Sequence, residues 1–568
     1  MTKKKKIILA SSISAAVLAV ALILTLCLTL IPREKIDLNL SAAQVENEQK
    51  VHVEWKTSIA PDQVIIKVKN SSGEELDSRT ISSPTMIAKG SIDLDVSYGK
   101  HTIEVTARKN NRASTTKSEV VKVYTDEYVI APLVATMPVT YFSLNIKEYT
   151  RDFSVPTFVW LGRGPAWNYE NLPENVYLMP VDSYSQLVGY THYNDMYEKT
   201  SKWVKELYEM NPSSTFHLYY NDYHPWGWMQ ATVANGIPSE NYDVTLLSDG
   251  TGSYYAFSKY MNRTDSDVVF ESMKADYNKL KSQIASKGSY NPGDRSLAIQ
   301  TEQLRHYVFC MLTEENNVKS VIARNFIGSD MPATSPMKEE FKKLVASDTN
   351  PDGKVLVLGL NNLLKNLSDE EQEDLKKLYK FSDNMFEKAA QENKKIMVLM
   401  GTSTSSETDF VNYAKATMAY YGDEYVYYYK GHPGYPVQLD LDKAARNDGL
   451  GLIDVDSTIA AELIFFFNQE ACASGYGSST YTSLVDEQVC GVWNVALDKV
   501  NTEYRDKVDY TITKLTMANP TYGVLATSSS YLFEFKDKSA YDCAVYDADR
   551  DTLKFYKLTD SLPIEVQR

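Results

Sequence analysis

The stretch Tyr425-Val-Tyr-Tyr-Tyr-Lys-Gly-His-Pro433 joins an apolar, aromatic run to a short polar end. The run from Tyr425 to Tyr429 predicts a buried strand, and Pro433 ends it because proline has no N–H to pair in a sheet. Gly431 would permit a tight backbone path here. A lysine and an imidazole are therefore expected at the carboxyl end of a strand, the edge where open α/β sheets bind ligands. The alternative is a surface turn with an incidental His432.

Size and composition limit the classes of protein that this chain can be. At 568 residues it should hold several domains, and its 43% hydrophobic content suffices for large cores. The net charge of −15 argues against nucleic acid as a partner, because binding it requires clustered Lys and Arg. The 40 tyrosines and 7 tryptophans suit carbohydrate stacking, but they also suit ordinary cores. The 5 cysteines show no paired spacing, so neither a disulfide framework nor a zinc site is indicated.

The N-terminus combines a positive cluster with a long apolar run. Four lysines, Lys3–Lys6, precede the uncharged stretch Ile7–Pro32. This stretch is longer than a signal-peptide core of about 7–15 residues and reaches the roughly 20 residues that span a bilayer. We predict a signal-anchor transmembrane helix within residues 1–35, with a long cleaved signal as the alternative. Because positive flanks stay cytoplasmic, the bulk of this single-pass membrane protein is expected to be extracellular or lumenal.

Residues 36–126 have the pattern of an all-β domain. Val51, Val53 and Trp55 alternate with polar residues, as in a half-buried strand. Similar runs follow at Gln63–Val68, Ile92–Val96, His101–Val105 and Glu119–Val123. Short strands at this spacing, separated by turn signals, predict an immunoglobulin-like sandwich that would act as a spacer or a binding module.

From residue 127 onward, strands alternate with long helices, which predicts parallel sheets. The expected strands are Thr157–Leu161, Val176–Met179, Thr215–Tyr220, Val244–Leu247, Ile396–Met400, Tyr425–Tyr429 and Gly451–Ile453. The expected helices are Asp195–Met210, Asp265–Lys287, Leu297–Thr313, Ser368–Asn393, Asp409–Tyr420 and Ile459–Phe467. We predict two Rossmann-like α/β domains, 127–390 and 391–568, the second with a β-rich tail. Two such domains that face each other across a cleft form the GT-B architecture of many glycosyltransferases, although unrelated proteins share it.

Two stretches of the first α/β domain carry candidate chemistry. The segment Thr245–Tyr254 is a strand that ends on Asp249 and a glycine-rich turn, where a carboxylate can serve as a general base; an ordinary Asp-Gly turn is the alternative. The segment Tyr219–Trp228 places His224 beside Trp226 and Trp228 after another strand. The alternative for this segment is a loop whose aromatic rings pack on the core.

Two further stretches lie in the second α/β domain. Met400–Ser406 is a strand end followed by hydroxyl side chains, and Gly475–Tyr481 places Ser478 and Ser479 at an expected helix N-terminus, which favours phosphate. Ser/Thr caps alone would explain both stretches. Asp454-Val-Asp456 resembles a metal-binding motif, but a helix cap explains it better, and no metal site is predicted.

Together these stretches resemble, in order, the bacterial sialyltransferases of glycosyltransferase family 80. Lys430-Gly-His-Pro433 resembles the family's His-Pro motif, whose histidine acts as acid or electrostatic partner to the departing CMP phosphate. Leu247-Ser-Asp-Gly-Thr251 resembles the acidic-acidic-Gly motif. By this resemblance Asp249 would be the base that deprotonates the acceptor hydroxyl.

The other matches concern the CMP-sugar donor. Asn221–His224 resembles a segment that brings a second histidine to the donor, and Gly401-Thr-Ser-Thr404 resembles a Gly-Thr-Thr-Thr run. Ser478-Ser479 resembles the serine pair on the CMP phosphate, and Ile459-Ala-Ala-Glu462 an Ile-x-x-Glu whose carboxylate lies near the cytidine. The donor site is therefore expected to comprise Asn221, His224, Gly401, Thr402, Lys430, Pro433, Glu462, Ser478 and Ser479.

The sequence departs from the family at two positions. Ser248 replaces the first acid of the acidic pair, and Ser405 stands where the family has a tryptophan near the acceptor. Trp226 or Trp228 is the candidate for stacking on the acceptor sugar instead.

The resemblance implies an inverting, metal-independent transfer of sialic acid from CMP-sialic acid to a galactoside-type acceptor glycan, without a cofactor. One alternative is transfer of another CMP-activated keto-sugar such as Kdo. The other, motivated by Ser248 and Ser405, is a catalytically decayed surface protein that binds glycans.

Overall fold

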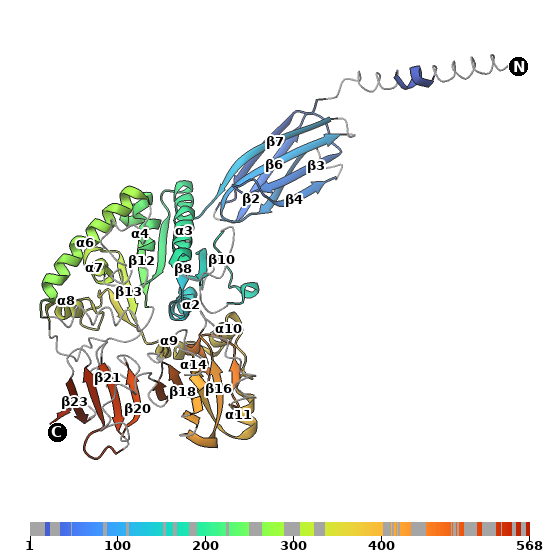
Figure 1. Ribbon diagram of the computed structural model, residues 1–568. Helices are drawn as coiled ribbons and strands as arrows, with labels where there is room; N and C mark the ends of the chain where they lie inside the picture. Colours follow the sequence, from blue (N-terminus) through green and yellow to red (C-terminus); the bar gives the residue numbers. More distant parts are fainter. Residues whose placement is uncertain are drawn as a thin grey trace, which may run out of the picture. The chain divides into compact units, whose positions relative to one another are not determined.

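The chain forms two compact units, Met1–Thr125 with Glu209–Pro212, and Asp126–Tyr208 with Ser213–Arg568. They are seen in a computed structural model (Figure 1). The structure describes residues 17–22, 35–46, 48–82, 88–109, 113–150, 155–162, 167–180, 190–222, 226–248, 264–288, 307–322, 335–401, 410–411, 414–415, 417–418, 421–432, 450–476, 478, 480, 484, 488–493, 508–513, 530–535, 537–547, 552–557 and 564–567.

The membrane segment predicted near the N-terminus lies largely outside these residues. The structure describes its residues 17–22, which are helical. Across the described part of the chain, no helix combines the length and the apolar character needed to cross a bilayer.

The first unit is built from two antiparallel sheets that share one core (Figure 1). One sheet has the order β1-β2-β5 and the other β4-β3-β6-β7. Their strands are β1 Leu38–Gln44, β2 Lys50–Thr57, β3 Gln63–Lys69, β4 Glu75–Ile81, β5 Lys89–Asp95, β6 Gly99–Lys109 and β7 Ala113–Val123. The alternating Val51, Val53 and Trp55 of β2 point into this core and are at most 2% exposed, as their period-2 pattern indicates.

A seven-stranded parallel sheet begins the second unit, with the order β10-β9-β8-β11-β12-β13-β14. Its strands are β8 Glu127–Val134, β9 Thr157–Gly162, β10 Val176–Leu178, β11 Thr215–Asn221, β12 Tyr242–Leu247, β13 Val318–Ile322 and β14 Val355–Val357. The central strand β8 was not predicted, and its Pro132 is unusual in a strand interior. The structure accommodates Pro132 because β8 pairs with β11 only as far as Ile130, so no ladder bond to β11 is lost.

The second parallel sheet has five strands in the order β17-β16-β15-β18-β19. They are β15 Lys395–Met400, β16 Tyr425–Lys430, β17 Ile453–Val455, β18 Ala471–Tyr476 and β19 Val489–Trp493. Alternate residues of β16 enter different cores, with Val426 and Tyr428 on one face and Tyr427 and Tyr429 on the other. The aromatic run is therefore a strand buried on both faces, as predicted. This mixed α/β fold with parallel sheets confirms the expected fold class in its coarse form.

The described helices include most of the expected ones and four that the sequence did not predict, Thr136–Thr150, Gly227–Ala231, Pro336–Leu344 and Leu360–Lys365. They are α2 Thr136–Thr150, α3 Tyr190–Met210, α4 Gly227–Ala231, α6 Ser266–Lys287, α7 Tyr307–Glu314, α8 Pro336–Leu344, α9 Leu360–Lys365, α10 Asp369–Leu378, α11 Glu387–Glu392 and α14 Ala461–Phe467. The single helix expected over 368–393 is two, α10 and α11. A capping box between Ser368 and Glu371 starts α10, and Lys380 follows it in the left-handed conformation (φ 52°), which a continuous helix cannot contain.

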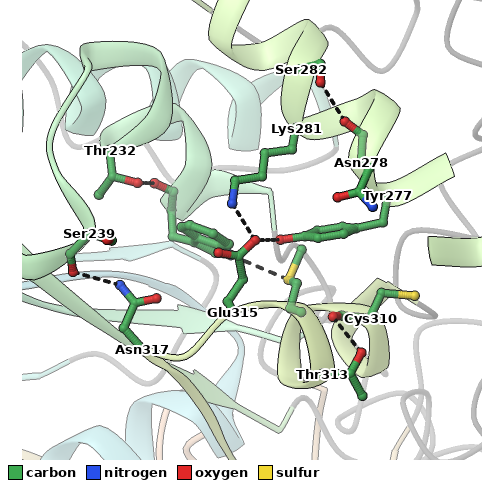
Figure 2. Close-up of polar contacts among 12 residues, drawn as sticks. Thr232, Ser239, Tyr277, Asn278, Lys281, Ser282, Cys310, Thr313, Glu315 and Asn317 are labelled. Carbon is green, nitrogen blue, oxygen red and sulfur yellow. Dashed lines mark hydrogen bonds and ion pairs between the residues drawn. The ribbon is translucent and has the colours of Figure 1, made fainter. Parts of the chain in front are cut away.

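A buried carboxylate ties together the helices beside the first parallel sheet (Figure 2). Glu315, just after α7, accepts a hydrogen bond from the Tyr277 hydroxyl of α6 at 2.6 Å and pairs with Lys281 Nζ of α6 at 2.5 Å. Lys354 Nζ donates to the Glu315 carbonyl at 2.6 Å. Burial and the Glu315 charge raise the pKa of Tyr277, so this phenol stays a donor.

Helix α14 is the element that the cores beside the two parallel sheets share. Leu463 and Phe466 pack in the cluster that also contains α2, α9 and α10. Ile464 and Phe465 pack in the cluster that contains β15 and β16. Because different side chains of α14 contribute to the two clusters, this one helix connects the two α/β halves.

The C-terminal tail forms an antiparallel sheet, β20-β21-β22-β23-β24. Its strands are β20 Val508–Thr513, β21 Ser530–Phe535, β22 Cys543–Asp547, β23 Thr552–Lys557 and β24 Ile564–Val566. Cys543 is 0% exposed and belongs to the core cluster of the second parallel sheet. The tail therefore packs against that α/β half.

Candidate functional site

Four chain segments emerge together at the carboxyl edge of the second parallel sheet. Gly401 follows β15, His432 follows β16, Asp456 follows β17 and Ser478 follows β18. The strands pair in parallel, so their carboxyl ends lie at one edge. The chain passes from β15 outward to β16 and β17 and then returns to β18 on the other side of β15. This reversal creates the crevice position at which open α/β sheets bind ligands.

Ser478 reaches this edge from a strand that the sequence did not predict. Residues 471–476 form β18, Thr480 has a 3-10 conformation, and residues 479 and 481–483 lie outside the described residues. The composition of β18, Ala-Cys-Ala-Ser-Gly-Tyr, is poor in β-branched residues. The strand is specified by its neighbours, because β15 and β19 pair with it on both sides.

The carboxyl edge of the second parallel sheet has positions where only glycine fits, but Gly431, which the sequence indicated, is not one of them. Gly475 has φ +129°, and a Cβ there would lie 2.4 Å from the Met400 backbone N and O. At Gly401 a Cβ would lie 2.8 Å from the Tyr429 hydroxyl. A Cβ at Gly431 would meet nothing closer than 3.5 Å. The tight backbone path expected at Gly431 is therefore wrong, and the close approach occurs at Gly475, between β18 and β15.

Lys430 is a buried cation that fixes the loops beside it. It is 2% exposed, and its Nζ donates to the carbonyls of Gly431 at 3.1 Å and Ser457 at 2.8 Å. Burial lowers the pKa of Lys430 to about 8, while the negative charges of Glu462, Asp456 and Asp454 act against this fall. Two of its three N–H donors thus connect the ends of β16 and β17.

Glu462, in the first turn of α14, is a buried carboxylate with one oxygen unmatched. It is 3% exposed, and Oε1 accepts a hydrogen bond from Thr480 Oγ1 at 2.9 Å. Among the described residues, Oε2 has no hydrogen-bond partner. Burial raises the pKa of Glu462, and the Thr480 hydrogen bond and the Lys430 charge oppose the rise. A buried polar atom of this kind costs free energy unless a donor reaches it.

Ser478 is connected to that carboxylate through Thr480. Ser478 Oγ donates to Thr480 Oγ1 at 3.1 Å and accepts from the Thr480 N–H at 3.3 Å. Thr480 is 4% exposed. The hydroxyls therefore form a directed chain from Ser478 through Thr480 to Glu462. The sequence did not indicate Thr480, because its partner lies 18 residues away and hydroxyls are common in turns.

The remaining donor-site predictions of this sheet are only partly placed. Gly401 donates its N–H to the Lys430 carbonyl at 2.9 Å, which extends the pairing of β15 and β16. His432 is half-buried directly after Gly431. Thr402, Pro433 and Ser479 lie outside the described residues.

In the first parallel sheet, Asn221 closes the corresponding crevice position. It ends β11, which lies beside β8 at the point where the strand order reverses. Its Oδ1 accepts from the Val134 N–H at 2.9 Å, and its Nδ2 donates to the Val134 carbonyl. Asn221 is 1% exposed. The side chain therefore bridges the diverging ends of β8 and β11, a structural role that its match to a donor-binding segment did not predict.

The two candidate acceptor tryptophans are core residues in this structure. Trp226 is 1% exposed and lies edge-on to Tyr197, with ring centroids 6.1 Å apart. Trp228 is 0% exposed, packs against Tyr242 and donates its indole N–H to Met311 Sδ. Neither ring offers a face on which a sugar could stack, so the core-packing alternative is the one that the structure shows.

His224 and Asp249 lie outside the described residues. Ser248, immediately before Asp249, is 0% exposed at the carboxyl end of β12, where its N–H donates to the Val321 carbonyl at 3.0 Å.

Asp456 closes a turn. Its Oδ1 accepts from the Thr458 N–H at 2.8 Å and from Thr458 Oγ1 at 2.7 Å. The N-cap of α14 is Ala460, so the helix begins later than the cap expected at Asp456 or Ser457. Over the described residues, no group of three or more His, Cys, Asp or Glu side chains is placed to hold a metal ion.

Comparisons with known proteins give distant likenesses only. No family model matches the chain, and no curated protein matches it. Among solved structures, a 2,6-sialyltransferase of a Photobacterium species, in complex with CMP and lactose, is 12% identical with a TM-score of 0.48, over 83% of this chain and 90% of that one.

Two other sialyltransferase structures are similar to the same degree. The enzyme of Photobacterium damsela is 12% identical with a TM-score of 0.46, over 79% of this chain and 90% of that one. The α/β-galactoside α-2,3-sialyltransferase of Photobacterium phosphoreum is 12% identical with a TM-score of 0.47, over 65% and 90%. Likenesses this low establish neither activity nor substrate, so any function must be argued from the residues of the site.

Proposed function

We propose that the protein is a glycosyltransferase with a GT-B architecture that takes its sugar from CMP-sialic acid and transfers it to a galactoside-type glycan. The observation that carries this proposal is the chain from Ser478 through Thr480 to Glu462 at the crevice position of the second sheet. The chain ends on Glu462 Oε1, and the other oxygen of that carboxylate, Oε2, lacks a donor among the described residues. The motifs around His432, Asp249 and Glu462 add the resemblance to family 80.

The donor site would combine two kinds of recognition. Glu462 Oε2 would accept from an N–H or O–H of the nucleoside, which satisfies the buried atom. Ser478 and Ser479 would hydrogen-bond the phosphate, with His432 beside it at the end of β16. Lys430 would supply positive potential from behind the loops that it fixes.

Transfer would proceed by a single displacement. Asp249 would take the proton from the acceptor hydroxyl as that oxygen attacks the anomeric carbon, and CMP would leave from the opposite face. His432 would stabilise the charge that develops on the departing phosphate, or protonate it. Because one displacement inverts configuration and side chains stabilise the charge, the reaction would be inverting and metal-independent.

The test is an assay of hydrolysis and transfer with purified full-length protein. We expect CMP release from CMP-sialic acid that speeds up when a galactoside is added. Preference for CMP-Kdo over CMP-sialic acid would change the proposed donor but retain the proposed mechanism. No CMP release from either donor, by protein that unfolds cooperatively, would refute the transferase.

A second candidate function, glycan binding without catalysis, is favoured by the first unit. A hollow of about 500 Å³ lies on the sheet β1-β2-β5. Its polar lining is formed by Asn39, Ser41, Glu54, Lys56, Lys89 and Ser91. Glycan binding together with a lack of CMP affinity would favour this candidate.

We further propose that the N-terminal segment anchors the protein in a membrane, with residues 36–568 extracellular or lumenal. The support is the lysine cluster followed by the uncharged run. CMP-sugars would then have to reach that compartment. Protease treatment of intact cells tests the orientation: digestion of residues 36–568 supports it, and protection until the membrane is permeabilised contradicts it.

A further inference from the structure

Two cysteines far apart in the sequence meet on neighbouring strands. Cys472 lies on β18 and Cys490 on β19. These strands pair in parallel, with Ala473 opposite Val489 and Ser474 opposite Gly491, so Cys490 is the extra residue of a β-bulge. A bulge re-aims the side chain that it contains. The register thus places Cys490 next to Val489, the partner of Ala473, which is the residue that follows Cys472.

Both thiols lie on the same face of the sheet. Each packs against the cluster that contains Met397, Leu399 and Tyr427, and each is partly exposed. The two thiols are close enough to influence each other's ionisation, and neither is in a disulfide. Tyr421 Oη donates to the Cys490 carbonyl at 2.6 Å, which fixes this part of β19.

The two thiols differ in reactivity. The hydrogen bond from Cys490 lowers the pKa of Cys472 to about 7, against the effect of partial burial, and the positive charge of Lys395 helps. The pKa of Cys490 is raised, because it donates that bond and a second negative charge would arise beside the first. A thiolate is the nucleophile in disulfide exchange. Cys472 is therefore suited to attack first and Cys490 to resolve.

We propose that Cys472 and Cys490 are a disulfide-forming pair that links β18 to β19. A disulfide bridges Cα atoms roughly 4.4–6.8 Å apart, a range comparable with the spacing of about 4.8 Å between neighbouring strands. With a small disulfide as oxidant, the Cys472 thiolate attacks one of its sulfurs and releases a thiolate. Cys490 then loses its proton and attacks the Cys472 sulfur, which expels the second thiolate. Two electrons and two protons leave the cysteine pair, and the oxidant becomes two thiols.

The disulfide between Cys472 and Cys490 would restrict the motion of the segment that contributes to the candidate site. The loop closed between Cys472 and Cys490 contains Ser478 and Thr480, whose hydroxyls lead to Glu462. Closing a loop restricts the unfolded chain and so stabilises the fold. We expect the oxidised protein to melt at a higher temperature than the reduced protein. This inference does not depend on the proposed transferase activity.

The test maps the bond in the intact protein. Reduced full-length protein is incubated with oxidised glutathione, trapped with an alkylating agent, and cleaved after Glu487, which separates Cys472 from Cys490 in the sequence. We expect the two peptides to be joined, and to separate only after reduction. Cys310 and Cys543, both 0% exposed, should stay thiols and serve as internal controls. Separate peptides after oxidation would overturn the proposal.

Matched variants test the order of attack. In Cys490→Ser, Cys472 should retain one glutathione as a mixed disulfide. In Cys472→Ser, Cys490 should react much more slowly at neutral pH. The rise in melting temperature on oxidation should disappear in both variants. Equal reactivity of the two single variants, or a temperature rise that persists in them, would contradict the assignment. Peptide mapping of the wild-type protein shows whether the disulfide forms, even if a variant folds poorly.

Discussion

Thr480 is the residue whose removal most directly probes the buried hydroxyl chain. In Thr480→Val the shape is kept, but Glu462 loses its hydrogen bond from Oγ1. A buried group left without its partner costs about 1–3 kcal/mol, so we expect the free energy of unfolding to fall by about that amount. Thr480→Ser keeps the hydroxyl and is the matched control. Equal stability of the two variants in urea unfolding would rule out the hydrogen-bond chain.

His432 carries the catalytic prediction. His432→Ala should lower the rate of CMP release by about 10²–10⁴-fold, as loss of a proton donor or acceptor in a transition state does. Gly431→Ala is the adjacent control, because a Cβ there meets nothing closer than 3.5 Å. A His432→Ala enzyme as fast as Gly431→Ala would remove His432 from the mechanism.

His217 provides a pH prediction away from the site. Its Nδ1 lies 2.5 Å from Asp243 Oδ2 and its Nε2 lies 2.6 Å from Glu127 Oε1. Burial lowers the pKa of His217, but the hydrogen bonds and charges of Asp243 and Glu127 outweigh it, so the pKa is raised above 6.5. Protonation therefore stabilises the folded state. The contribution is complete below pH 6.5 and is lost as the pH rises through the folded-state pKa.

Urea unfolding across this pH range measures the contribution. The difference in unfolding free energy between the wild type and His217→Gln should be largest below pH 6.5 and should shrink at higher pH. A difference that grows with pH would mean that His217 is buried as the neutral form.

At the scale of elements, strand β18 is held against β15 by a glycine. Gly475→Ala would place a Cβ 2.4 Å from the Met400 backbone at φ +129°, so backbone would have to move. We expect a loss of several kcal/mol in unfolding free energy, as large effects come from strain of this kind. Gly431→Ala should be neutral. If Gly475→Ala is also neutral, β18 does not pair with β15 at this register.

The elements differ in how far the sequence predicts them. The run Tyr425–Tyr429 is readable because aromatic and β-branched residues between turn signals favour a strand. Strand β18 is not, because Ala, Cys, Ser and Gly form a strand only when both neighbours are in place. Strand β8 was missed because Pro132 argues against a central strand. Strand β8 tolerates Pro132 because its pairing with β11 ends at Ile130. That pairing is a feature of the tertiary structure and cannot be predicted from the local sequence.

The residues of the candidate site also differ in how far the sequence predicts them. Lys430 and His432 were predicted at the carboxyl end of a strand, and they lie at the end of β16 and just after it. Glu462 and Ser478 were named by the resemblance to family 80, and their roles in donor binding stay predictions. The sequence could not locate Thr480, or the roles of Asn221 and the two tryptophans. Those depend on contacts between distant segments, such as Asn221 with Val134.

At the scale of the whole molecule, we expect α14 to make the two α/β halves one cooperative unit, because its residues belong to both cores. Leu463→Ala removes a fully buried side chain from the core of the first half and should cost about 2–5 kcal/mol. Because α14 also belongs to the core of the second half, we expect hydrogen exchange to accelerate in both parallel sheets. Strands β1–β7, which have their own core, should be unchanged. Faster exchange in the first sheet alone would disprove the shared core.

The central claim is that the crevice position of the second parallel sheet binds a cytidine monophosphate group through Glu462. Calorimetric titration of CMP into the full-length protein tests it most directly, with His217→Gln as a remote control. The account predicts one CMP per chain, with an affinity that falls at least about tenfold in Glu462→Gln, equivalent to about 1.4 kcal/mol, and is unchanged in His217→Gln. No heat of binding in the wild type, or equal affinity in Glu462→Gln, would contradict it.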